Sequence, residues 1–274
     1  MRWLLYTNLF IATAAAVLSA GSFRLLGQEP DPWFCVWVFM ATICVYTVQR
    51  LMKLRTYSLS TEMMAWVAAH RRGLSLVTVV SLLASFLMAL KLPFELLLNA
   101  WPMALISLLY TFPFLPRHGQ RIALREWPYA KLFLIAGVWT FITIWMPMRL
   151  SAIDIGTWEI AMLLERFAFI MAITIPFDIR DEGLDSPGMR TLPQVMGRKG
   201  ATVLAIGLLL LSWGILLLGM KKDHISSGSM FWTSTVYTLS LILIYIGRRP
   251  RANWFYLGLL DGQMILLGVI WMLS

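Results

Sequence analysis

Long apolar runs constrain this 274-residue chain more than any other feature. Nine of them approach the length of about 20 residues that crosses a bilayer as an α-helix. Short connections separate them, so we expect one integral-membrane domain over residues 1–274: an all-α bundle of nine transmembrane helices. A hydrophobic content of 59% with only 14% charged residues excludes an ordinary soluble domain. The runs lie near residues 3–22, 33–52, 74–90, 96–113, 130–147, 158–177, 201–219, 229–247 and 254–273.

The charge distribution indicates how the bundle is oriented. The formal net charge is +9, but the basic residues are not gathered as a nucleic-acid partner would require. With a cytoplasmic N-terminus, most of the 23 Lys and Arg residues fall in inside segments, which is the positive-inside pattern. We therefore predict a protein of the cell inner (cytoplasmic) membrane, with its N-terminus cytoplasmic, its C-terminus outside and no nucleic-acid partner. No small-residue cleavage site follows the first run, so we expect it to be a retained helix.

One inside segment predicts a helix that lies along the membrane. Glu62 falls in the first turn of this helix, around residues 61–72, and Ser60 is a candidate N-cap. Met63 and Trp66 give it an apolar side, while its end is basic. We expect it to lie in the interface and to cap a pocket between the spans.

The stretch IPFDIRDEGLDSPGMRTLPQVMG, residues 175–197, concentrates acidic residues at the end of an apolar run. On a continuing helix Asp178, Asp181 and Asp185 would face one way. Carboxylates so close repel one another unless a cation lies between them. Oxygen ligands suit Mg²⁺, which bridges carboxylates to phosphates, so we predict a metal site for an amphiphile that carries a diphosphate. The alternative is a solvated acidic loop, which the preceding apolar run disfavours.

This stretch resembles the second aspartate-rich motif of the UbiA superfamily of intramembrane prenyltransferases. Met189 stands where the family has Lys, and the rest of the chain is similar only in general features. The resemblance implies that the three aspartates are catalytic and bind Mg²⁺, and that the membrane-embedded substrate is a prenyl diphosphate. The motif positions that match are Asp178, Asp181, Asp185, Gly188, Arg190, Thr191, Leu192 and Gly197.

A second stretch, LLYTFPFLPRHGQRIALREWPYAKLFLIAGVW, is similar to the family's connection between helices four and five. In the family, basic residues of this connection approach the diphosphate. On this resemblance Tyr110, Arg125, Lys131 and Arg190 are candidate substrate-binding residues.

The family's first motif, N-D-x-x-D, is absent. The second run ends instead in ICVYTVQRLMKLR, and no carboxylate occurs between Asp31 and Glu62. The residues at i, i+3, i+4 and i+7 share one helical face and are further substrate-binding candidates. The simpler alternative is that Arg50 and Lys53 only mark the inside end of the helix. This alternative fits Lys53 best. The four are Tyr46, Gln49, Arg50 and Lys53.

Two mechanisms remain open. In the first, one Mg²⁺ binds the three aspartates while Arg50, with Lys131 or Arg125, contacts the phosphates. The allylic C–O bond then ionises and a lipid-soluble acceptor attacks the carbocation. In the second, Arg50 pairs with Asp178 or Asp181, and the protein is a catalytically silent lipid binder or a subunit of a membrane complex. A transporter is disfavoured because no pair of Gly- or Pro-broken helices marks a midplane site.

Four further polar residues lie within the runs. Glu165 and Arg166 fall near mid-membrane, where charge is costly. They point about 100° apart, so we expect Glu165 to pair with another helix rather than with Arg166. Asp261 and Gln263 are expected to form hydrogen bonds between helices.

Three aromatic residues, Tyr110, Trp139 and Phe177, either line a prenyl tunnel, where rings stabilise a cation, or pack in the core. The sequence carries no feature that identifies the acceptor, the prenyl length, a protein partner or an oligomeric state.

Overall fold

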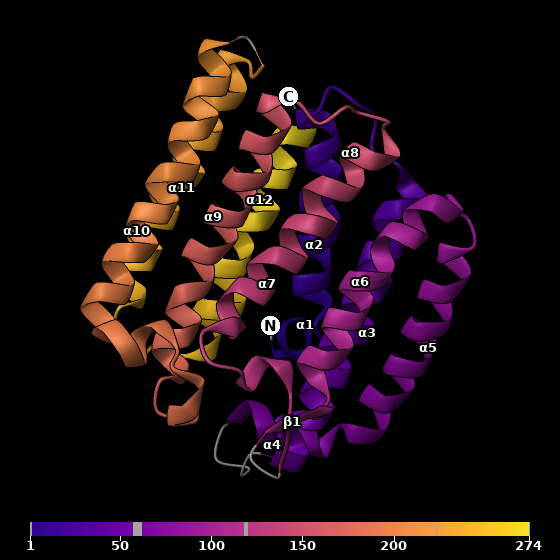
Figure 1. The fold of residues 1–274 in the computed structure, drawn as a ribbon, viewed down its shortest axis with the longest axis vertical. Helices are drawn as coiled ribbons and strands as arrows, with labels where there is room; N and C mark the ends of the chain where they lie inside the picture. Colours follow the sequence, from indigo (N-terminus) through magenta and orange to yellow (C-terminus); the bar gives the residue numbers. More distant parts are fainter. Residues whose placement is uncertain (1, 57–61, 118–119, 223, 274) are drawn as a thin grey trace.

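The computed structural model describes residues 2–56, 62–117, 120–222 and 224–273. They form a bundle of long helices (Figure 1), which confirms the predicted all-α class. The only strands in these ranges form one short antiparallel hairpin. The elements are α1 Arg2–Tyr6, α2 Leu9–Leu25, α3 Pro32–Thr56, α4 Glu62–Ala69, α5 Arg71–Ala89, α6 Phe94–Thr111, β1 Leu115–Arg117, β2 Gln120–Ile122, η1 Leu124–Glu126, α7 Ala130–Thr140, η2 Phe141–Trp145, α8 Met146–Leu150, α9 Thr157–Asp181, η3 Pro187–Met189, α10 Leu192–Lys221, α11 Ser227–Gly247, η4 Phe255–Leu260 and α12 Asp261–Met272.

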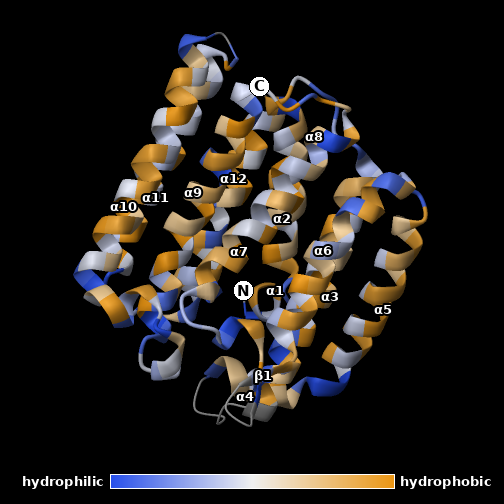
Figure 2. Ribbon diagram, viewed as in Figure 1, coloured by the Kyte–Doolittle hydropathy of each residue, from blue (hydrophilic) through white to orange (hydrophobic). Residues whose placement is uncertain are grey.

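Eight helices in the described part of the chain are long and apolar enough to cross a membrane. Two of these spans contain a π-helical turn: α7, η2 and α8 form one, and η4 with α12 forms another. The remaining predicted run, the first, corresponds to α1 and α2, and α2 is apolar but shorter than the other spans. Hydrophilic residues gather toward the ends of the bundle, whereas α5 and α10 are largely hydrophobic along their lengths (Figure 2). The chain is therefore an integral membrane protein, with eight spans supported by length.

The first run, predicted as one helix over residues 3–22, is broken. Asn8 adopts a left-handed conformation with φ 66° between α1 and α2, which Asn tolerates better than most residues. Its side-chain amide donates a hydrogen bond to Thr47 Oγ1 at 3.1 Å. Arg50 Nη1 donates to the carbonyl oxygens of Leu5 and Tyr6, at 3.0 and 2.6 Å. The prediction was wrong here because α3 supplies hydrogen-bond partners to the break.

Close backbone contact joins the first and last long helices. Helix α12 packs along α2, and α9 packs between α7 and α10. A Cβ atom added at Gly21 would lie 2.6 Å from the carbonyl oxygen of Gly268. No side chain fits between the two helices at this point, so glycine is required for their approach.

The end of the bundle that carries α4, the β1–β2 hairpin and η3 is called the polar end below (Figure 1). The helix predicted over residues 61–72 is present there as α4 and ends earlier, at Ala69; Ser60 lies outside the described residues. Trp66 of α4 packs edge-on against Trp3 of α1, with ring centroids 4.9 Å apart. Helices α1 and α4 therefore form one aromatic-lined layer at this end.

Candidate functional site

A cavity of about 240 Å³ lies between the helices and reaches the polar end. Helices α3, α6, α7 and α9 contribute most of its wall, and α2, α4, η4 and α12 contribute the rest. Apolar side chains such as Ile135, Val138 and Ile170 line its deeper part. Its charged side chains are Arg50, Lys53, Lys131, Asp178, Arg180, Asp181 and Asp261.

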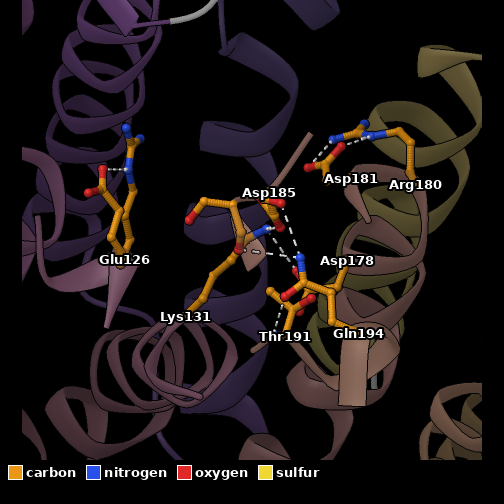
Figure 3. Close-up of polar contacts among 10 residues, drawn as sticks. Glu126, Lys131, Asp178, Arg180, Asp181, Asp185, Thr191 and Gln194 are labelled. Carbon is orange, nitrogen blue, oxygen red and sulfur yellow. Dashed lines mark hydrogen bonds and ion pairs between the residues drawn. The ribbon is translucent and has the colours of Figure 1, made fainter. Parts of the chain in front are cut away.

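Lys131 lies between two of the motif aspartates. Its Nζ is 2.9 Å from Asp178 Oδ1 and 2.6 Å from Asp185 Oδ2, as Figure 3 shows. Helix α9 ends at Asp181, so Asp185 lies in the following turn. The expected common helical face for all three aspartates was therefore wrong. Lys131 nevertheless brings two of them together, at the position that the sequence assigned to a metal ion.

Gln194 stabilises the turn between Asp185 and the start of α10. The Gln194 side chain accepts a hydrogen bond from the backbone N–H of Thr191 at 3.0 Å and donates one to the carbonyl oxygen of Asp185 at 3.1 Å. The first of these is half of a capping box at the start of α10. Gly197 then turns the chain with φ 70° and ψ 166°, a region essentially restricted to glycine. These motif residues fix the turn that returns Asp185 to Asp178.

The third aspartate is held by its neighbour. Arg180 Nε lies 2.7 Å from Asp181 Oδ1, and Arg180 Nη2 lies 3.1 Å from Oδ2, the bidentate geometry that Arg favours with a carboxylate. The guanidinium also lies over the ring of Tyr256, 4.8 Å from its centroid. Arg180 was not among the predicted site residues. Its place between two motif aspartates was the signal that could have identified it.

The aspartates as arranged do not fit Mg²⁺. No three His, Cys, Asp or Glu side chains converge within the described ranges. Lys131 fills the space between Asp178 and Asp185, and Arg180 occupies both oxygens of Asp181. A metal ion here would have to displace cations of the chain itself.

The face of α3 that replaces the first motif lines the cavity as predicted, with Tyr46, Gln49, Arg50 and Lys53 all in its wall. Arg50 donates to the two backbone carbonyls of α1 and forms no ion pair with Asp178 or Asp181 in the described structure. The pairing required by the second mechanism is therefore not formed. Lys53 has no hydrogen bond or ion pair with any described residue.

The remaining substrate-binding candidates divide between two places. Tyr110 lines the cavity. Arg125 is buried on η1, outside the cavity wall, 3.9 Å from Glu126. Arg190, with φ 45°, lines a shallow surface hollow that it shares with Asp185. Tyr110 therefore meets the expected cavity, whereas Arg125 and Arg190 do not.

The aromatic candidates and the two polar residues of α12 also have defined positions. Trp139 and Phe177 line the cavity, so neither is only a core residue. Gln263 accepts a hydrogen bond from Ser240 of α11 at 3.2 Å, as predicted. Asp261, expected to bond between helices, is buried in the cavity wall instead.

Glu165 and Arg166 lie deeper along α9 and are both fully buried. Glu165 Oε1 accepts hydrogen bonds from Ser212 and Tyr237, at 3.0 and 2.6 Å, which confirms the expected partner on another helix. Arg166 Nε nevertheless lies 3.6 Å from Glu165 Oε2. The expectation that they would not pair was wrong, because their flexible side chains overcome the angle between their Cβ directions.

Comparisons with known proteins place the fold. No protein-family model matches the sequence, and no curated protein matches it. The structure of a UbiA homologue from Archaeoglobus fulgidus superimposes with a TM-score of 0.65 at 14% identity over 100% of both chains. The same homologue bound to GPP and Mg²⁺ gives a TM-score of 0.64 at 13% identity over 100% of both chains.

A UbiA homologue from Aeropyrum pernix K1 gives a TM-score of 0.64 at 14% identity, covering 99% of this chain and 96% of that one. At sequence identities this low, structural similarity shows a shared fold and does not show a shared reaction. The predicted resemblance is confirmed at the level of the fold: this chain is an integral membrane protein with the UbiA fold.

Proposed function

We propose that this protein is a divergent member of the UbiA superfamily that moves a prenyl group from an isoprenoid diphosphate to a lipid-soluble acceptor. One observation carries the proposal: the cavity has cationic side chains toward the polar end and apolar walls deeper along the same helices. An amphiphile with an anionic head and a hydrocarbon tail matches this division. Solved structures of a UbiA homologue contain GPP or DMAPP with Mg²⁺, which supports the same class of ligand.

In this proposal, phosphate binding and stabilisation of the allylic cation are assigned to different side chains. Arg50 and Lys53 bind the phosphate oxygens, since neither is paired with a carboxylate. Positive charge at this position stabilises the diphosphate as it leaves. Phe177 and Tyr110 present aromatic groups to the allylic cation. No step is assigned to Mg²⁺, which remains a prediction of the resemblance, because Lys131 and Arg180 hold its predicted ligands.

The orientation belongs to the proposal as well. The basic residues are concentrated on the polar end and its connections, so the cavity faces the cytoplasmic side of the inner membrane. Water-soluble diphosphate is then released into the cytoplasm, and the prenylated product stays in the bilayer.

A second candidate is a catalytically silent relative that binds lipid or serves in a membrane complex. The observation in its favour is that Asp178, Asp181 and Asp185 are all held by cations of the chain. Such a protein retains the cavity while its acidic motif acts only as a structural element.

Diphosphate release separates the two candidates. Purified protein is incubated with allylic diphosphates of increasing length and a membrane lipid extract, in Mg²⁺ and separately in EDTA. We expect release of diphosphate, and at least about a 10-fold loss of rate in Lys53→Met, which removes a cation assigned to the leaving group. Lys91→Met, an exposed lysine outside the cavity, is the matched control. Binding without release supports the silent relative, and failure to bind any of the diphosphates excludes the proposed transferase.

A further inference from the structure

We infer that Tyr46 and Trp139 form the floor of the cavity and restrict it to short isoprenoid donors, with one or two isoprene units. The inference rests on the proposed function and specifies its substrate. Trp139 of α7 donates a hydrogen bond from Nε1 to the hydroxyl oxygen of Tyr46 on α3 at 3.1 Å. Both side chains line the cavity, so the bond joins the parts of the wall that α3 and α7 contribute.

The two residues lie at the deep end of the cavity. From Lys131 to Trp139 the lining of α7 extends about 12 Å, at about 1.5 Å per residue. On α9 the lining extends farther, from Asp181 to Ile170, which is about 16 Å at the same rise. The diphosphate head occupies the cationic part of this depth, which leaves about 10 Å along α9, from Phe177 to Ile170, for the hydrocarbon chain.

What lies behind the floor does not accept hydrocarbon. Thr143, one turn beyond Trp139, donates a hydrogen bond from Oγ1 to the Trp139 carbonyl oxygen at 2.7 Å. Arg166 Nη1 in turn donates to Thr143 Oγ1 at 2.9 Å. Thr143 and Arg166 are 0% exposed. A prenyl chain that continued straight through the floor would have to separate a buried guanidinium from its partners, which is costly.

The volume agrees with a short donor. An engineered protein cavity of about 150 Å³ binds benzene, so at the same filling about 240 Å³ holds roughly ten non-hydrogen atoms. Because the diphosphate head shares this volume, the estimate excludes a four-unit chain and favours the shortest donors. Forcing a longer chain into a packed cavity displaces side chains at a cost of about 1–3 kcal/mol or more.

Ligand affinity as a function of chain length tests the inference. Binding of dimethylallyl, geranyl, farnesyl and geranylgeranyl diphosphate to the purified protein is measured by calorimetry in detergent with Mg²⁺. We expect geranyl diphosphate to bind at least about 10-fold more tightly than geranylgeranyl diphosphate, the size of discrimination that a shaped apolar pocket provides. Trp139→Ala, which removes the floor, should reduce this ratio by about 10-fold.

Three further variants make the result specific. Tyr46→Phe keeps the ring and loses only the hydrogen bond, so it should retain the length preference. Trp213→Ala makes the same truncation outside the cavity, where Trp213 donates to Ser234, and should leave the ratio unchanged. If Trp139→Ala fails to fold, Tyr46→Ala opens the same floor from α3.

Equal affinity of the native protein for geranyl and geranylgeranyl diphosphate would overturn the inference and leave the proposed function intact. So would a length preference that survives removal of either floor residue. If the protein binds none of the four diphosphates, the inference is overturned together with the function on which it rests.

Discussion

Helix α9 carries two charged clusters that differ in what surrounds them. The mid-helix cluster is Glu165 with Arg166, and the end cluster is Asp178, Arg180 and Asp181. Each contains an acid next to an arginine, paired at 3.6 Å in the first and 2.7 Å in the second. Only the end cluster lines the cavity. The two clusters contain the same residue types, and they differ in whether their side chains reach the cavity.

The mid-helix cluster is closed by its neighbours. Arg166 Nη1 donates to Ser22 Oγ at 3.0 Å, and its guanidinium lies 5.1 Å from the ring centroid of Trp271. Arg166 Nε and Nη2 have no hydrogen-bond partner among the described residues. The cluster thus connects α9 to several helices at the cost of incompletely satisfied buried charge.

Breaking the mid-helix cluster should have the largest effect on stability. Arg166→Met leaves the Glu165 carboxylate buried without a cation, and we expect the free energy of unfolding to fall by about 3–5 kcal/mol. Unfolding by SDS in mixed micelles measures the change.

The double variant Glu165→Gln/Arg166→Met removes both charges and should recover most of that loss. If the double variant is less stable than Arg166→Met, uncompensated charge is not the reason for the destabilisation.

Removing the cation of the motif should have an intermediate effect. Lys131→Met leaves Asp178 and Asp185 without their partner, and we expect a loss of roughly 1–3 kcal/mol in the free energy of unfolding. Since Lys131 lies at the predicted metal position, Mg²⁺ should raise the melting temperature of this variant more than that of the native protein. Thermal scans with and without Mg²⁺ measure both effects.

Lys131→Arg keeps the charge and is the control. Equal stabilisation of native protein and Lys131→Met by Mg²⁺ would show that the lysine does not occupy a metal position.

The smallest effect on stability is expected at Lys53. It has no ion pair with a described residue, so Lys53→Met should change the free energy of unfolding by no more than about 0.5 kcal/mol. Affinity for an allylic diphosphate should nevertheless fall by about 10-fold, through loss of a charge-assisted contact. Calorimetry compares this variant with Lys91→Met, an exposed lysine outside the cavity. An unchanged affinity would remove Lys53 from the proposed site.

The bundle was predictable because apolar length alone specifies a membrane helix. The break at Asn8 was not, because it depends on donors from Arg50 and Asn8 itself that meet acceptors far away in the sequence. The shared face of Tyr46 and Arg50 was predictable because both lie well inside one helix. The face expected for Asp185 was wrong because α9 ends before it.

Pairwise contacts between distant segments account for what the sequence did not reveal at the site. The bond between Trp139 and Tyr46 joins residues 93 positions apart, and the ion pair between Lys131 and Asp185 joins residues 54 positions apart. Periodicity places a residue on a face but does not identify the residue opposite it. Arg180 illustrates the same limit, since its charge indicated topology while its partner was its own neighbour.

The glycine contact between α2 and α12 bears on how the protein is made. Ribosomes release α2 early and α12 last among the described helices, so Gly21 and Gly268 can meet only after every intervening segment has been inserted. Ile11 and Met264 stand on opposite sides of this late seam and both contribute to the cavity wall. Nascent protein therefore lacks the α12 part of the cavity wall until biosynthesis is nearly finished.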